Sequence, residues 1–253
     1  MKLRVEDMAI AFENKKILEH VSLQVAEGEF VALIGPSGCG KSTLLNILAG
    51  VLQAAEGCFY VDDEKVEGIS SHFAYMPQSD LLLPWHTILE NVTLYGRLHH
   101  AKKQAQQQAL KEFATFGLAG YEHAYPKELS GGMRQRAAFL RTALCSADIL
   151  LLDEPFGALD VITRNDMQDW LLAMRKELQK TTLLVTHDID EALYLADRIL
   201  ILGGSPASIV KEINLHEVVK SRDWLFTQGE QRKEIYSLLR GVACMMHICI
   251  SAI

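Results

Sequence analysis

Residues 35–42 read Gly35-Pro36-Ser37-Gly38-Cys39-Gly40-Lys41-Ser42, which matches the phosphate-loop pattern G-x-x-x-x-G-K-[ST] in full. Five apolar residues, Phe30-Val31-Ala32-Leu33-Ile34, come directly before the loop and predict a strand buried on both faces. The residues from Lys41 to Ala49 carry apolar side chains at helical spacing. A chance match in a glycine-rich turn has no reason to lie between a buried strand and a helix. We therefore interpret the loop as a phosphate-binding site.

The residue types of this loop suit triphosphate chemistry. Its glycines permit a tight turn whose backbone N–H groups point inward at phosphate oxygens. The start of the following helix adds the positive end of its dipole. The ammonium group of Lys41 can reach the β- and γ-phosphates, and the hydroxyl of Ser42 can ligate Mg²⁺.

A second apolar run ends in two carboxylates, in the sequence Ile149-Leu150-Leu151-Leu152-Asp153-Glu154. Ligands of parallel sheets sit at the carboxyl ends of the strands, so we expect both carboxylates beside the phosphate loop. Asp153 is expected to hold Mg²⁺ through water. Glu154 is expected to polarise the attacking water as a general base.

A third motif reads Leu129-Ser130-Gly131-Gly132-Met133-Arg134-Gln135-Arg136 and predicts a helix with Ser130 as its N-cap. Capping alone does not explain the two glycines, which let a backbone approach a ligand closely at a helix end that favours phosphate. A chain with one phosphate loop has no use for a second phosphate-binding helix end. We therefore expect two copies to face each other, each offering Ser130 and Gly132 to the nucleotide on the other copy's loop.

The composition is that of a globular protein with a substantial core. Of the 253 residues, 49% are apolar, and the net charge of −7 argues against a general nucleic-acid-binding protein, because that class carries a basic excess. The five cysteines have no zinc-binding spacing and indicate free thiols. We expect no signal peptide and no membrane span, since the first residues are charged and no run approaches about 20 apolar residues.

Strand-like and helix-like segments alternate along the chain. We expect strands at 3–12, 17–25, 148–152, 182–185 and 199–202, short strands between 61 and 78, and helices at 162–180, 188–195 and 221–240. Residues 87–147 are typical of a helical region between two strand-rich parts. Alternation of this kind predicts an α/β fold with a parallel sheet and right-handed crossovers.

The three motifs stand in the order found in the nucleotide-binding subunits of ABC transporters, and the chain resembles that family from residue 1 to about residue 205. The resemblance implies a P-loop NTPase fold with a RecA-like parallel sheet core, an N-terminal antiparallel β part and a helical subdomain inserted at about 80–147. It implies an ABC ATPase domain over 1–205 and a mostly helical C-terminal extension over 206–253. It also implies ATP hydrolysis by a head-to-tail homodimer that drives a separate integral-membrane permease.

Further positions of the family pattern are present in this sequence. Phe12 resembles the aromatic residue that stacks on adenine, with a place in the core as the alternative. Gln78 resembles the glutamine that contacts Mg²⁺ and the attacking water, and His187 resembles the histidine that hydrogen-bonds the γ-phosphate. The implied ATP-binding residues are Phe12, Gly35, Pro36, Ser37, Gly38, Cys39, Gly40, Lys41, Ser42, Thr43, Ser130, Gly131, Gly132 and Asp160; the implied catalytic residues are Lys41, Gln78, Glu154 and His187; the implied Mg²⁺ ligands are Ser42, Gln78 and Asp153.

The segment Asp80-Leu81-Leu82-Leu83-Pro84-Trp85 carries a finer resemblance. It is similar to importer ATPases of the nitrate, sulfonate and taurine group, which includes subunits for the thiamine precursor hydroxymethylpyrimidine. Residues 136–142, followed by 155–160, favour that pyrimidine branch. Because the segment follows Gln78, we expect it where the helical subdomain meets the permease. Leu81, Leu82, Leu83 and Trp85 would then form an exposed apolar patch, and an ordinary subdomain core is the alternative.

The resemblance places the subunit at the cytoplasmic face of the cell membrane, attached to a permease and acting indirectly with a solute-binding protein, without nucleic acid. Two alternatives share the same ATP chemistry: an exporter or lipoprotein-release ATPase, and a soluble ABC ATPase of translation or DNA repair. The second alternative usually has two fused nucleotide domains or a long coiled-coil insertion, and this chain has one set of motifs and no heptad run. Residues 241–253 match no part of the family pattern.

Overall fold

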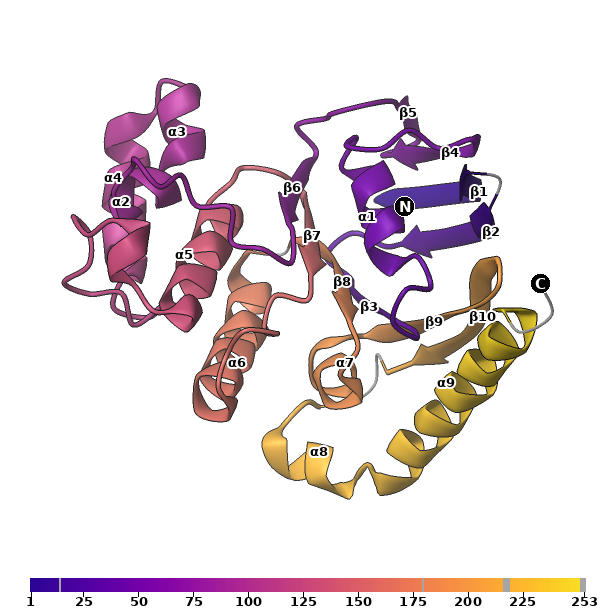
Figure 1. Cartoon of the computed structure of the whole chain (residues 1–253). Coiled ribbons are helices and arrows are strands. Elements are labelled where there is room, and N and C mark those ends of the chain that lie inside the picture. Colours follow the sequence, from indigo (N-terminus) through magenta and orange to yellow (C-terminus); the bar gives the residue numbers. More distant parts are fainter. Residues whose placement is uncertain (14, 179, 216–218, 251–253) are drawn as a thin grey trace.

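The computed structural model describes residues 1–13, 15–178, 180–215 and 219–250, without the side chains of residues 174, 176–178 and 242–250. In this part of the chain ten strands form one mixed sheet (Figure 1). Their order is β5 (Glu64–Val66), β4 (Glu56–Val61), β1 (Leu3–Phe12), β2 (Lys15–Val25), β10 (Ala207–Asn214), β9 (Arg198–Gly204), β3 (Phe30–Ile34), β8 (Thr181–Thr186), β7 (Ile149–Asp153) and β6 (Phe73–Met76). The last residues of the expected C-terminal extension, 251–253, lie outside the described part of the chain.

One half of the sheet is parallel and explains the apolar runs of the sequence. Strands β9, β3, β8, β7 and β6 run parallel to one another, and every residue of β3, β7 and β8 is buried. Alternate side chains of β3 enter two different core clusters, one on each face of the sheet. Strands covered on both faces need apolar residues on both, which is why these segments read as continuous apolar runs.

The other half of the sheet is antiparallel. Strand β1 pairs with both β2 and β4, and β4 pairs with β5 in the same antiparallel manner. The burial of β1 alternates along its length, as a strand with one core-facing side requires. The two halves together confirm the expected α/β fold with a parallel core and an N-terminal antiparallel part.

The helices lie on both faces of the sheet and beyond one edge of it. Figure 1 shows α1 (Lys41–Leu48) beside the N-terminal strands and the helical region on the far side of β6 and β7. That region holds α2 (Ile88–Val92), α3 (Leu94–Leu98), α4 (Lys102–Glu112), a short 3₁₀ turn (Pro126–Glu128) and α5 (Gly131–Ala143). The remaining helices are α6 (Val161–Leu178), α7 (Ile189–Leu195), α8 (Arg222–Thr227) and α9 (Gly229–Ile250).

Strand β10 is the element that the sequence did not predict. The chain turns back at Gly204, whose φ of +97° favours glycine, and β10 then pairs antiparallel with β9 and parallel with β2. The sheet thus continues past residue 205, where the expected domain boundary lay. Most residues of β10 are exposed or half-buried, and burial does not alternate along the strand. Its sequence therefore lacks the apolar alternation that predicts a strand.

None of the described helices is both long enough and apolar enough to cross a bilayer.

Candidate functional site

The phosphate loop joins β3 to α1 as expected, and its glycines are sterically required. A side chain at Gly35 would bring its Cβ within 2.4 Å of the Leu202 carbonyl oxygen, and Gly40 has a φ of +105°. The Nζ of Lys41 donates to the carbonyl oxygens of Gly35, at 2.8 Å, and Pro36, at 2.9 Å. Its ammonium group is therefore held inside the loop, with the side chain almost fully buried.

Other expected ATP contacts in the loop differ in exposure. Ser37 and Gly38 are exposed at its tip, and Thr43 is half-buried in the first turn of α1. Cys39 is buried in the core cluster that contains β1 and α1, and burial raises the pKa of its thiol. The side chain of Cys39 thus points away from the loop into the core.

Asp153 and Ser42 meet across the gap between β7 and α1. The hydroxyl of Ser42 donates to Oδ1 of Asp153 at 3.1 Å. Asp153 is 3% exposed, and burial raises its pKa although the Ser42 hydrogen bond lowers it. Burial, together with the Asp153 charge, raises the pKa of the neighbouring Tyr75 to about 12, so this phenol stays protonated.

These groups fit a magnesium ion. Mg²⁺ prefers hydroxyl, carboxylate and phosphate oxygens and keeps several waters, and Ser42 and Asp153 supply the first two kinds of ligand. A cation beside the buried Asp153 would stabilise its charged form. In the described residues no group of three or more His, Cys, Asp or Glu side chains could hold a metal. A magnesium site here would therefore depend on nucleotide phosphates as well as on protein ligands.

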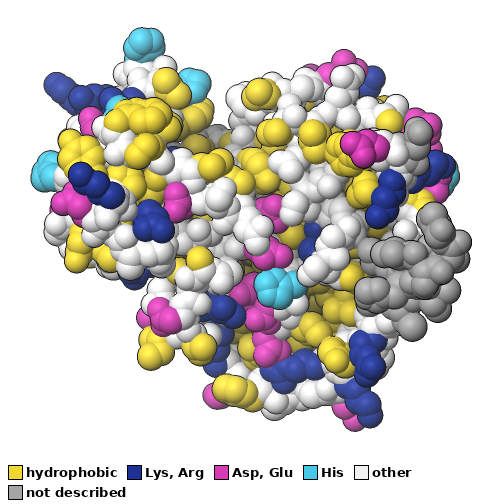
Figure 2. All heavy atoms as spheres, in the orientation of Figure 1, with side chains coloured by type: hydrophobic (Ala, Val, Ile, Leu, Met, Phe, Trp, Pro, Cys, Tyr) yellow, Lys and Arg dark blue, Asp and Glu magenta, His cyan; other side chains and the backbone are white. Residues whose placement is uncertain are grey.

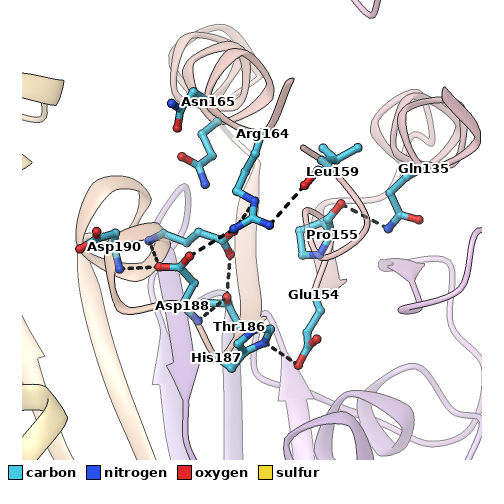
Figure 3. Close-up of polar contacts among 12 residues, drawn as sticks. Gln135, Glu154, Pro155, Leu159, Arg164, Asn165, Thr186, His187, Asp188 and Asp190 are labelled. Atoms are coloured by element: carbon cyan, nitrogen blue, oxygen red, sulfur yellow. Dashed lines mark hydrogen bonds and ion pairs between the residues drawn. The ribbon is translucent and has the colours of Figure 1, made fainter. Parts of the chain in front are cut away.

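The carboxylate of Glu154 contacts side chains from two loops. Its Oε2 accepts a hydrogen bond from Nε2 of Gln78 at 3.1 Å, and its Oε1 lies 3.2 Å from Nδ1 of His187. Figure 3 shows Glu154 and His187 pointing toward each other from neighbouring strand ends. The backbone of Glu154 has a φ of +48°, which costs roughly 1–2 kcal/mol for a residue other than glycine. Strain of this kind gathers at functional sites.

The Ser130 helix end is capped as expected, but its glycines have no steric role within the chain. The hydroxyl of Ser130 accepts a hydrogen bond from the Met133 N–H at 3.3 Å. A Cβ on Gly132 would come no closer than 3.5 Å to another atom, Cδ2 of Leu159, and a Cβ on Gly131 no closer than 3.9 Å. Neither glycine has a left-handed φ. Within the described residues, no close contact of an added Cβ requires glycine at either position.

Two further expected ATP contacts lie on the surface. Phe12 is 45% exposed at the end of β1, so the alternative of a core position for it is wrong. Asp160 is exposed just before α6, where its carboxylate accepts a hydrogen bond from the Thr163 N–H at 3.1 Å. This bond lowers the pKa of Asp160.

The apolar patch is smaller than the sequence predicted. Leu81 and Trp85 are 61% and 69% exposed, but Leu82 is 8% exposed and packs in the core of the helical region. Asn91 explains this arrangement, because its buried side chain bonds the backbone of Leu83 in both directions and turns the segment inward. The patch therefore consists of the exposed Leu81 and Trp85.

A cluster of polar residues beside His187 was missed by the sequence reasoning. Thr186, Asp188 and Glu191 surround His187 in the chain, and Arg164 reaches them from α6 (Figure 3). Only Asp188 gave a recognisable signal, since an aspartate before a predicted helix is a typical N-cap. On the face seen in Figure 2, acidic side chains and a histidine gather at the centre beside a hollow with apolar walls.

Comparison with known proteins identifies the family. The family model described as "ABC transporter" matches residues 18–157. This chain belongs to the ABC transporter family. It is an ATP-binding subunit of that family and an ATPase.

The relatives cover nearly all of this ABC ATPase. The chain is 44% identical to the formylaminopyrimidine import ATP-binding protein ThiZ of Halalkalibacterium halodurans, over 96% of each chain. It is 42% identical to the taurine import ATP-binding protein TauB of Yersinia pestis, over 85% of this chain and 84% of that one.

A solved ABC transporter cassette, MJ0796, has the same fold. Its dimeric structure superposes with a TM-score of 0.75 at 30% identity, over 84% of this chain and 98% of that one. A second dimeric structure of MJ0796 is a post-hydrolysis state bound to ADP and Pi, with a TM-score of 0.74.

Proposed function

We propose that this ABC ATPase is the energising subunit of an importer for a small solute, either a sulfonate, taurine or nitrate type of anion or a hydroxymethylpyrimidine-like ring. The observation that carries the proposal is its likeness to two import ATP-binding proteins, TauB and ThiZ, over 85% and 96% of its length. Their solutes differ, so the choice between a sulfonate and a pyrimidine belongs to the partner proteins. An exporter ATPase is the second candidate because it shares the nucleotide chemistry.

In the proposed mechanism Glu154 is the general base. Its carboxylate is held from two sides by Gln78 and His187, so it can orient a water without first reorganising. Lys41 neutralises phosphate charge, and His187 contacts the γ-phosphate. Catalysis then comes mainly from positioning and charge neutralisation, as is general for phosphoryl transfer.

Mg²⁺ would be held by Ser42, Asp153 and Gln78 together with the nucleotide. The ion supplies charge neutralisation at the phosphates. Ser42 and Asp153 are already joined at 3.1 Å, which supports a common ligand role. Gln78 links this site to the base, because its amide N–H bonds Glu154 and its carbonyl oxygen is free to face a cation.

Two copies would sandwich two ATP molecules head to tail. The support is the pair Gly131 and Gly132, for which the described residues show no steric requirement, and the dimeric state of the related cassette MJ0796. Each copy would present Ser130, Gly131 and Gly132 to the γ-phosphate on the other copy's loop. Phe12, exposed at the end of β1, would stack on adenine, and Asp160 would lie at the dimer contact.

The membrane partner would dock at the segment after Gln78, through the patch formed by Leu81 and Trp85. Arg141 of α5 donates to the carbonyl oxygens of Asp80 and Leu81, both at 2.8 Å, so the patch is tied to the helix that begins at Ser130. Dimer closure and permease movement would be coupled through these two hydrogen bonds of Arg141. The subunit would act at the cytoplasmic face of the membrane, with a solute-binding protein as an indirect partner.

The test is a gentle pull-down of the full chain from its native membranes, with the co-purifying proteins identified. We expect a polytopic permease and a solute-binding protein. A permease without any binding protein would favour export. Ribosomal proteins or DNA without a permease would refute the transport assignment and leave the ATPase chemistry intact.

A further inference from the structure

Arg164 lies on the first turn of α6 and touches two loops that the nucleotide chemistry uses. One Nη donates to the Leu159 carbonyl oxygen at 3.3 Å, just before Asp160. The other Nη lies 3.5 Å from Oδ2 of Asp188, the residue that follows His187. Figure 3 shows the guanidinium group between these two partners. A planar guanidinium has donors on several edges, so one side chain can hold both loops at once.

Behind His187 a second contact completes the arrangement. The Nε of Arg164 lies 3.9 Å from Oε1 of the buried Glu191, while Oε2 of Glu191 accepts a hydrogen bond from the Thr186 hydroxyl at 2.6 Å. The same hydroxyl accepts a bond from the Asp188 N–H at 3.0 Å. Thr186, before His187, therefore bonds the Glu191 carboxylate directly, and Asp188, after His187, is linked to it through the Thr186 hydroxyl. That carboxylate faces Arg164.

The contact between Arg164 and Glu191 is incomplete in this state. The Nε–H of Arg164 is buried and has no hydrogen-bond partner among the residues that the structure describes. An unpaired buried donor is unfavourable, because its lost hydrogen bond to water is not replaced. A movement of about 1 Å between α6 and α7 would bring Nε and Oε1 to hydrogen-bond distance.

We propose that Arg164 is a positioning residue that couples the loop at 157–160 to His187, so that movement of that loop sets the position of His187 against Glu154. The loop at 157–160 reaches Arg164 through the Leu159 carbonyl. Arg164 reaches His187 through Asp188 and Glu191, and His187 lies 3.2 Å from the Glu154 carboxylate. The inference rests on the proposed catalytic roles of Glu154 and His187. It adds Arg164 as the residue that connects Glu154 and His187 to the loop of Asp160, where we expect the dimer contact.

Loss of Arg164 should affect the rate of catalysis but not the binding of ATP. The polar partners of Arg164 are Leu159, Asp188 and Glu191, which all lie outside the phosphate loop, so its loss should leave ATP affinity intact. Misplacing a reacting group by about 1 Å can lower a rate by up to about a hundredfold. Loss of a positioning residue should therefore lower kcat without raising the Kd for ATP. Loss of a nucleotide contact would instead raise that Kd.

The experiment compares Arg164→Gln and Arg164→Lys with the parent chain, measuring phosphate release and the affinity for a fluorescent ATP analogue. Arg222→Gln is the matched control, because Arg222 also anchors α6, through Asp169 and the Asn165 carbonyl, without contacting either loop. Glu154→Gln serves as the benchmark for lost chemistry. Thermal melts check the folding of every variant.

We expect Arg164→Gln to lower kcat about tenfold or more with the Kd for ATP within about twofold. Arg164→Lys should recover part of the rate, since it keeps the charge and loses the fork, and Arg222→Gln should keep the parent rate. A parent-like Arg164→Gln beside an inactive Glu154→Gln would overturn this inference alone. An equal loss in Arg222→Gln would also overturn it, because loosening of α6 would then suffice. An active Glu154→Gln would instead refute the proposed base and, with it, the coupling to it.

Discussion

At the scale of single residues, the site contains a buried carboxyl group, that of Glu191, whose pKa is raised. Glu191 is 4% exposed, and burial raises its pKa to about 7, although the Thr186 hydrogen bond lowers it. Three ionisable side chains face it, those of Asp188, Arg164 and His187. The motif Ile149–Glu154 predicted the place of Glu154, because a strand end defines it. Nothing in the sequence marked Glu191, because an acidic residue on a short helix is ordinarily solvated.

Stability should depend on pH through Glu191. The pKa of this carboxyl is higher in the folded chain, at about 7, than its ordinary value of 4.5, so the folded state binds the extra proton between these values. Its contribution is therefore fully present below pH 4.5 and is lost as pH rises through 7. We expect Glu191→Gln to gain stability relative to the parent from pH 5 to pH 8, by at most roughly 3 kcal/mol. Urea unfolding at several pH values measures this difference, and a difference independent of pH would contradict the assignment.

At the scale of elements, two glycine-containing helix starts behave differently. Before α1, Gly35 is packed against the Leu202 carbonyl of β9, so the fold itself demands a glycine. At the start of α5, Gly132 has free space around its Cα. The sequence predicted both helix starts, since loop and cap motifs are local. It could not separate the two reasons for glycine, which depend on what each backbone faces.

Replacing each glycine by alanine separates these reasons. Gly132→Ala should leave the free energy of unfolding unchanged or raise it by up to about 1 kcal/mol, because alanine favours helix. Its ATPase rate should nevertheless fall about tenfold or more, since the methyl group would hold the partner's phosphate away. Gly35→Ala should lower stability through its clash with the Leu202 carbonyl oxygen. Chemical unfolding and phosphate release measure both effects, and a Gly132→Ala variant with parent activity would argue against the facing dimer.

At the scale of the whole molecule, the helical region shares one hydrophobic core cluster with the nucleotide core, in which Phe139 of α5 packs against Phe156 and Trp170. Gln135 of α5 donates to the Pro155 carbonyl next to Glu154, at 3.2 Å. Arg134 and Arg141 bind Asp80 in the segment that follows Gln78. These bonds connect the Ser130 helix, the proposed base and the apolar patch. A partner seated on the patch is thus mechanically close to the nucleotide site.

Permease docking should depend on the patch. We expect Leu81→Ala combined with Trp85→Ala to abolish co-purification of the permease from native membranes, because exposed apolar side chains supply the buried centre of an interface. The thermal midpoint should stay within about 2 °C of the parent value, since both side chains are exposed. Phe226→Ala is the control, as Phe226 is 77% exposed on α8. Undiminished permease recovery with the double variant would refute the docking site.

The sequence by itself determined the features that lie within a few consecutive residues. The phosphate loop, the carboxylates after β7 and the cap at Ser130 each follow from local backbone geometry, and the apolar runs follow from burial on both faces of a parallel sheet. Because the carboxyl ends of parallel strands share an edge, the meeting of Glu154 with His187 was also predictable.

Only the tertiary structure decided what depends on packing between distant segments. It pairs β10 with β2, buries Leu82 in place of exposing it, and brings Arg164 against both Leu159 and Glu191. None of these follows from residue type, because a half-exposed strand, a leucine and an arginine each fit many settings. Their positions are set by strand register and helix packing, which the whole chain determines together.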